Sequence, residues 1–116
     1  MKKSDKLKLF QLLLQDEFKL KHRVNFAKNK FLRFDGDPCM GMYEGTKFSE
    51  KKIIHKIRLS TSEIKSDKDL FCTLAHEYVH AWQIEHDLDL GHDDKSGFTQ
   101  WRKYFNDTYK VDIVSF

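Results

Sequence analysis

The residues best suited to chemistry form the run His76-Glu77-Tyr78-Val79-His80, an HExxH motif. On an α-helix, residues four apart differ by about 40° in direction and about 6 Å in height, so two imidazoles at this spacing can bind one metal ion. Glu77 points roughly 100° away from His76, where it can hold a zinc-bound water instead of binding the metal. Zinc lowers the pKa of that water, and Glu77 can pass its proton to a leaving amine. The motif therefore predicts one zinc ion, metal ligands His76 and His80, and the catalytic residue Glu77.

A catalytic zinc ion usually has a third protein ligand and an open fourth position. If the helix continues, His86 lies about 15 Å along its axis from His76 and faces away from the histidine pair. His92 follows a helix-breaking glycine, after which the chain can return beside the site. We therefore predict His92 as the third ligand, with His86 or a carboxylate of Asp93 or Asp94 as alternatives.

Three amphipathic helices are predicted around this motif. Ser66, followed by acidic residues, is typical of a helix start, and apolar residues then recur at helical spacing to about residues 84–86. The apolar face is complete without the two histidines, which therefore lie on a second face. A last helix is predicted over about residues 96–109. An N-terminal helix, capped by Ser4, carries the apolar stripe Leu7, Phe10, Leu13, Leu14 and Phe18.

The segment between the first two helices predicts a small sheet. Val24 and Phe26 alternate with polar residues, and the run Asp35-Gly36-Asp37-Pro38 predicts a turn. Residues 39–43, ended by Glu44-Gly45, and residues 53–60 predict two further strands; residues 111–114 can add an edge strand. The predicted fold is α+β and zincin-like: an N-terminal helix, a mostly antiparallel sheet of about three strands, the HExxH helix and a C-terminal helix. No repeat or linker divides residues 1–116, which predicts a single domain.

The composition excludes several classes of protein. Two cysteines, Cys39 and Cys72, are too few for a disulfide framework or a four-cysteine zinc ribbon. They indicate buried thiols, with a single disulfide between them as the alternative. The N-terminal apolar stretch is short and interrupted by polar residues, unlike a secretion signal. No apolar run approaches about 18 residues, so no membrane partner is expected. His22 and His55 lack a partner at ligand spacing and are interpreted as structural or surface residues. These features predict a cytoplasmic protein.

Charge is divided unevenly along the chain. Residues 1–60 contain 15 Lys/Arg against 7 Asp/Glu, whereas residues 61–116 contain 6 against 11. Single-stranded nucleic acid is often held by cations and stacking rings together, although phenylalanines can instead fill a core beneath a lysine-rich face. We predict the rings as core, and the charges as either a DNA contact or a solvated surface. The residues concerned are Lys19, Lys21, Arg23, Lys28, Lys30 and Arg33, with Phe26, Phe31 and Phe34.

Residues 73–83 and 91–101 resemble the SprT-like (Spartan-type) zinc metallopeptidase family. That family has a helical HExxH motif, a short loop with a Gly-His ligand, and a helix with an aromatic residue a few positions on. The resemblance implies His76, His80 and His92 as zinc ligands and Glu77 as catalytic base. It also implies proteolysis of DNA-associated or DNA-crosslinked proteins. The chain has about two extra residues before Phe98 and lacks the zinc ribbon, so it resembles a small single-domain member, of a size that suits a phage protein acting in the host cytoplasm.

Three functions are consistent with this pattern. The first is a zinc-dependent metalloprotease acting on proteins near DNA. The second is a DNA- or protein-binding module with a structural or vestigial zinc site. The third is a metal hydrolase acting on a non-peptide bond, because the motif activates a water molecule but does not determine which kind of bond that water attacks. The residue that stabilises the oxyanion is not selected by spacing; Tyr78, Tyr104 and Arg102 are candidates.

Overall fold

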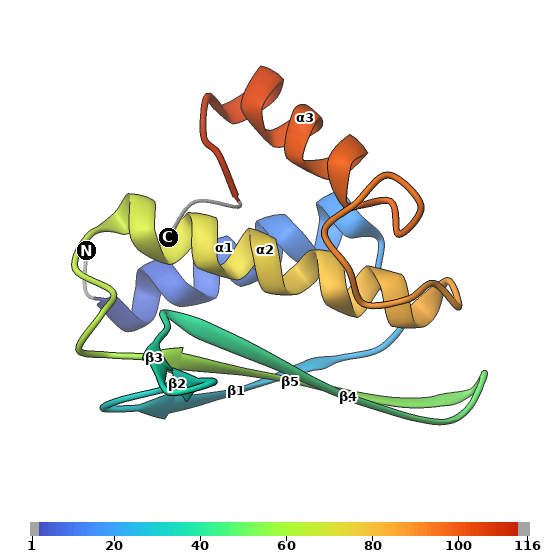
Figure 1. The fold of residues 1–116 in the computed structure, drawn as a ribbon, viewed down its shortest axis with the longest axis horizontal. Helices are drawn as coiled ribbons and strands as arrows, with labels where there is room; N and C mark the ends of the chain where they lie inside the picture. The colour runs from blue at the N-terminus through green and yellow to red at the C-terminus, as the bar shows by residue number, and fades with distance from the viewer. Residues whose placement is uncertain (1–2, 114–116) are drawn as a thin grey trace.

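Helix α2 (Asp67–Glu85) is the central element and carries the HExxH motif. The computed structural model describes residues 3–113, in which a small sheet lies under α2 and α1 (Lys3–Phe18), and α3 (Phe98–Tyr109) lies across the other side of this helix pair (Figure 1). The predicted α+β order, with the HExxH helix between a sheet and a C-terminal helix, is therefore confirmed.

The start and end of α2 agree with the sequence signals. The Ser66 side chain accepts a hydrogen bond from the backbone N–H of Asp69 at 3.0 Å, which satisfies one of the free donors of the first turn. The helix ends at Glu85, and His86 is its C-cap. Most of the helix is buried because both the sheet and the other helices pack against it.

The sheet has the strand order β1 (Val24–Asn29), β5 (Lys52–Ser60), β4 (Gly41–Ser49). Strands β4 and β5 form an antiparallel hairpin, whereas β1 pairs with β5 in parallel. Strands β2 (Arg33–Phe34) and β3 (Asp37–Pro38) form a separate two-stranded hairpin. Its turn is the predicted one, with positive φ values of 51° at Asp35 and 84° at Gly36.

Strand β4 is longer than predicted. The pair Glu44-Gly45 does not end it, and the strand continues to Ser49. Gly45 has a different role: a side chain there would collide with the ring of Tyr43, which lies along the strand over this position. The glycine therefore makes room for an aromatic ring, which is a reason unrelated to strand termination.

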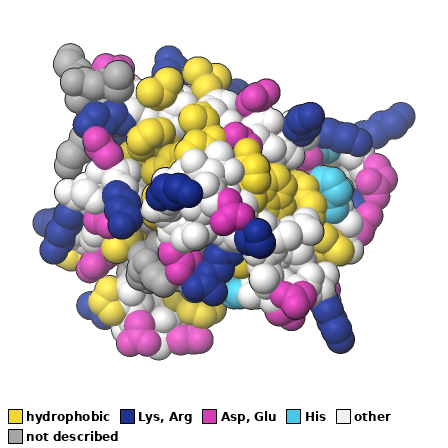
Figure 2. Space-filling view, turned by 90° about the horizontal axis from the view of Figure 1, so that it is seen from above, with side chains coloured by type: hydrophobic (Ala, Val, Ile, Leu, Met, Phe, Trp, Pro, Cys, Tyr) yellow, Lys and Arg dark blue, Asp and Glu magenta, His cyan; other side chains and the backbone are white. Residues whose placement is uncertain are grey.

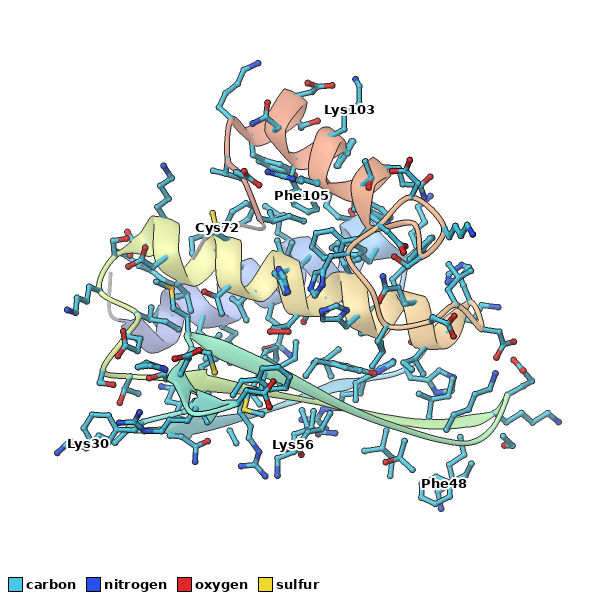
Figure 3. The ribbon with its side chains drawn as sticks, in the orientation of Figure 1. Lys30, Phe48, Lys56, Cys72, Lys103 and Phe105 are labelled. Carbon is cyan, nitrogen blue, oxygen red and sulfur yellow. The ribbon has the colours of Figure 1, made fainter. Side chains whose placement is uncertain are left out.

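The core confirms most of the predicted apolar stripes. Leu14 and Phe18 of α1 are buried, and Leu7, Phe10 and Leu13 pack partly buried against them. Phe105 of α3 is fully buried between the helices (Figure 3). The remaining buried apolar residues of this core are Val24, Ile57, Leu59, Phe71, Leu74, Ala75, Tyr78, Val79, Phe98 and Ile113.

Two local predictions are wrong, and the start of the last helix differs from the prediction by about two residues. Ser4 lies inside α1, which includes Lys3, and so does not cap it. Helix α3 begins at Phe98 after Gly97, whose φ of 81° and contact with the Trp82 ring exclude any larger residue there. Residues 111–113 form no strand; Ile113 is buried, and its carbonyl oxygen accepts a hydrogen bond from His76, not from a neighbouring strand. Val114 lies outside the described residues.

Among residues 3–113, no helix is long and apolar enough to cross a membrane. Both cysteines are free thiols. Cys72 is buried, as predicted, whereas Cys39 is only half-buried.

Candidate metal centre

Three histidines from two parts of the chain converge beside α2. His76 and His80 project from the helix, and His92 comes from the loop between α2 and α3. The Nε2 atoms of His76 and His92 are 3.1 Å apart, and one ring nitrogen from each of the three lies within 4.8 Å of the others. The structure thus brings together the three residues that the sequence selects as ligands.

The alternative third ligands lie elsewhere. His86 is exposed and stacks on the Trp82 ring, with its Nδ1 2.9 Å from the Trp82 carbonyl oxygen. The carboxylate of Asp93 accepts a hydrogen bond from the backbone N–H of Ser96 within its own loop. Asp94 is exposed and does not belong to the cluster.

The ring orientations of the two helical histidines suit metal binding. Nδ1–H of His76 donates to the carbonyl oxygen of Ile113 at 2.7 Å, and Nδ1–H of His80 donates to Oε1 of Gln83 at 2.8 Å. These bonds place the proton of each neutral ring on Nδ1, so Nε2 carries the lone pair through which an imidazole binds a metal.

Electrostatics favour the same protonation state. Burial, together with the neighbouring His80 and His92, lowers the pKa of His76 to about 4 despite its hydrogen bond to Ile113. Burial also lowers the pKa of His80. Near neutral pH both rings are uncharged, so the donor set is an all-imidazole one that fits zinc.

Glu77 lies next to this centre as a buried carboxyl group. The Glu77 residue is 5% exposed, and no hydrogen bond to its carboxyl group is found among the described residues, so burial alone shifts its pKa, raising it to about 8. An unpartnered buried acid is costly for folding, and such groups gather at functional sites.

The histidines and Glu77 line one open cleft of about 520 Å³ between α2 and the start of β4. Gly41 sets how closely the two elements approach, because a Cβ atom there would lie 2.6 Å from Cγ2 of Thr73 and 3.5 Å from Cγ of Glu77. The remaining lining residues are Phe34, Cys39, Met40, Met42, Tyr43 and Leu90.

Gln83 has a role that sequence reasoning missed. It is fully buried; its Oε1 accepts from His80, and its Nε2 donates to the carbonyl oxygens of Gly91 at 2.9 Å and Ser96 at 3.2 Å. These two carbonyls lie on either side of His92 in the loop. One amide therefore orients one helical ligand and anchors the loop that carries the third.

We expect Gln83→Leu to raise the zinc dissociation constant by about 10- to 100-fold, the usual effect of removing a partner that orients a ligand. Competition with a chromophoric chelator measures this constant. Gln100→Leu, at an exposed position of α3, is the matched control. An unchanged constant in a variant whose metal-free form is still folded would contradict the role of Gln83.

His55, interpreted as structural or surface from the sequence, is fully buried. Its ring joins Tyr43 (Oη to Nδ1, 2.6 Å) to Glu85 (Nε2 to Oε2, 2.8 Å). Glu85 also accepts from the backbone N–H groups of Lys21 and His22. Burial lowers the pKa of His55 more than Glu85 raises it, so the neutral ring accepts from Tyr43 and donates to Glu85. The network holds the Tyr43 ring beside His80, with centroids 6.2 Å apart.

None of the three candidates for oxyanion stabilisation reaches the cleft. Tyr78 is fully buried in the core. The Tyr104 hydroxyl donates to Glu17 at 2.7 Å. Arg102 forms a two-point ion pair with Asp112. These residues were candidates because a hydroxyl or guanidinium group can stabilise an oxyanion, but the fold places all three outside the cleft.

No family model, curated protein or solved structure matches the chain. The nature of the site therefore follows from its own geometry: three convergent imidazoles, a buried acid beside them, and an open cleft. This combination defines a candidate metal-binding centre.

Proposed function

We propose that the protein is a zinc-dependent metalloprotease of the SprT-like type that hydrolyses peptide bonds in DNA-associated or DNA-crosslinked proteins. The observation that carries the proposal is the convergence of His76, His80 and His92 at an open cleft that also holds the buried Glu77. In this arrangement the three imidazoles hold the ion and the carboxylate serves as the base.

Each side chain has a distinct task. A zinc ion at this centre would supply a polarised water and a positive charge. Next to a cation, the carboxylate form of Glu77 is favoured over the neutral form that burial alone promotes. Glu77 then accepts a proton from the attacking water and returns it to the leaving amine.

Two features favour a catalytic site over a structural one. Structural zinc sites are usually closed by four protein ligands, whereas the ligand cluster found among residues 3–113 has three members. The cluster also faces an open cleft, so a fourth position is accessible to water and substrate.

The sheet favours a peptide as the substrate. Strand β4 begins at the cleft and is an edge strand, paired only with β5 among the described residues. The free backbone groups of an edge strand can pair with an extended peptide. This feature favours an amide-bond substrate over other electrophiles.

The direct test measures metal content and cleavage together. We expect one zinc ion per chain, cleavage of an unfolded protein such as casein and of a DNA–protein adduct, and loss of both activities with a chelator. A free oligonucleotide and a phosphoester substrate serve as controls for non-peptide hydrolysis. Cleavage that persists without metal, or that is restricted to the controls, would refute the proposal.

A second candidate function, contact with single-stranded nucleic acid, is favoured by one surface. Phe31 and Phe34 are 64% and 63% exposed, so the prediction that these rings fill the core is wrong; only Phe26 packs against it. Lysines accompany exposed rings: Lys30 lies over Phe31, and Lys52 lies over Phe48 at 5.1 Å. Exposed rings and cations together suit unpaired bases and phosphates.

Part of this surface lies on the side of the sheet that the helices leave uncovered, whereas Phe34 lines the cleft that contains the histidines. Lys30, Phe48 and Lys56 project on that uncovered side, away from α1 and α2 (Figure 3). Seen from α3, by contrast, the surface intersperses Lys and Arg with Asp and Glu (Figure 2). We therefore assign the proposed nucleic-acid contact to the uncovered side of the sheet.

We expect binding of a single-stranded oligonucleotide to weaken steeply with salt, by about 0.7 logarithmic units in affinity per logarithmic unit of salt for each phosphate contacted. Lys56→Glu should lower both the affinity and this slope. Lys103→Glu, on α3 at the opposite side of the molecule, should change neither (Figure 3). Fluorescence anisotropy measures both quantities. Equal effects of the two substitutions, or no binding at low salt, would exclude this surface.

A further inference from the structure

Two large apolar side chains stand exposed at the candidate centre. Phe34 of β2 is 63% exposed, and Leu90 of the loop after α2 is 52% exposed. Both line the cleft that contains the histidines and Glu77, although they come from separate elements. Neither belongs to the hydrophobic core, so packing of the core does not account for them.

Away from the histidines and Glu77, the rest of the cleft is also lined mostly by apolar side chains. Met40, Met42 and Tyr43 continue the lining from Phe34 toward the histidines. The chain is 34% charged, yet the lining contains no Lys or Arg, and its one acid is Glu77. A concave apolar surface around a few polar groups is the usual character of a ligand site.

We propose that this cleft selects polypeptide segments with a large apolar side chain next to the cleaved bond, held between Phe34 and Leu90. The inference rests on the proposed peptidase function and adds its substrate class. A charged side chain in this cleft would lose water without gaining a partner, whereas an apolar one would cover both exposed residues.

This selection has a consequence for the state of the substrate. Large apolar side chains are mostly buried in folded proteins. A cleft that requires one therefore acts on unfolded chains or on locally opened segments. Native proteins are then poor substrates even when they contain the preferred sequence.

The experiment compares two ten-residue peptides that differ only at the central position, Leu in one and Lys in the other. Binding is measured by fluorescence anisotropy with the zinc-loaded Glu77→Gln protein, and cleavage by kcat/KM with the wild type. We expect the Leu peptide to be favoured by about 10- to 100-fold in both measurements.

Matched variants locate the preference. Leu90→Ser should reduce it by about 10-fold, whereas Leu12→Ser, at a 66% exposed leucine of α1, should leave it unchanged. Phe34→Ser should reduce it similarly, whereas Phe34→Leu should largely restore it. Thermal unfolding of each variant, compared with the wild type, shows that the fold is retained.

The outcomes separate this inference from the proposed function. Preferential binding of the Leu peptide without cleavage of either peptide would refute the peptidase and support the apolar cleft. Equal binding and equal cleavage of the two peptides would overturn the apolar cleft and support the peptidase. An equal loss of preference in Leu12→Ser and Leu90→Ser would also overturn it.

Discussion

Replacing Glu77 by glutamine is expected to reduce proteolysis by about 10²- to 10⁴-fold while zinc remains bound. Glutamine has nearly the same shape as glutamate, but its amide cannot accept the proton of the attacking water. Because no hydrogen bond to the Glu77 carboxyl group is found among the described residues, the substitution breaks none of theirs. The measurement is turnover of casein or of a DNA–protein adduct, with zinc content determined on the same samples.

The variant distinguishes three interpretations of the site. Loss of cleavage with zinc retained supports a catalytic base. Loss of zinc would indicate that Glu77 is a metal ligand. Full activity would show that Glu77 takes no part in the reaction. If neither the wild type nor the variant cleaves any protein, the melting temperature of His76→Ala tests for a structural zinc site. Such a site predicts that His76→Ala melts at a lower temperature than the wild type.

Removing any one of the three histidines is expected to weaken zinc binding by about 10²-fold or more. Structural zinc sites with four ligands bind with about 10–16 kcal/mol, or about 3 kcal/mol per ligand, and each 1.4 kcal/mol is a factor of ten. His80→Ala and His92→Ala should therefore both lose stoichiometric zinc at micromolar concentrations. His86→Ala, at an exposed ring outside the cluster, is the control and should keep it.

This comparison is sharpest for the third ligand. His92 is supplied by a loop, so its contribution depends on the loop conformation that Gln83 anchors. Retention of zinc by His92→Ala, with loss in His86→Ala, would reverse the assignment. A smaller effect of Gln83→Leu in the His92→Ala background than in the wild type would show that Gln83 acts partly through the loop.

Local sequence patterns were sufficient to predict the helix of the candidate site and the three histidines that converge there. The Ser66 cap, the helical apolar spacing and the two histidines four residues apart are all contained within α2. His92 could be predicted because a helix-breaking glycine lies directly before it in the sequence, a short distance from the motif, although α2 already ends at Glu85. These inferences depend on neighbours in the sequence, where geometry is nearly fixed.

Features that depend on distant contacts could not be predicted in this way. The parallel pairing of β1 with β5, the network from Tyr43 through His55 to Glu85, and the hydrogen bond from His76 to Ile113 all join remote segments. Composition was also insufficient for Phe31 and Phe34. A phenylalanine is usually buried, and only the fold shows that these two are left on the surface.

Because Gly41 has no side chain, a substitution there would change the distance between α2 and β4. A single methyl group there meets Thr73 before it meets any ring or carboxyl group of the centre. Alanine at this position would therefore push β4 away from α2 without changing the histidines or Glu77. A wider cleft admits larger groups, which makes Gly41 the natural starting point for changing what this cleft binds.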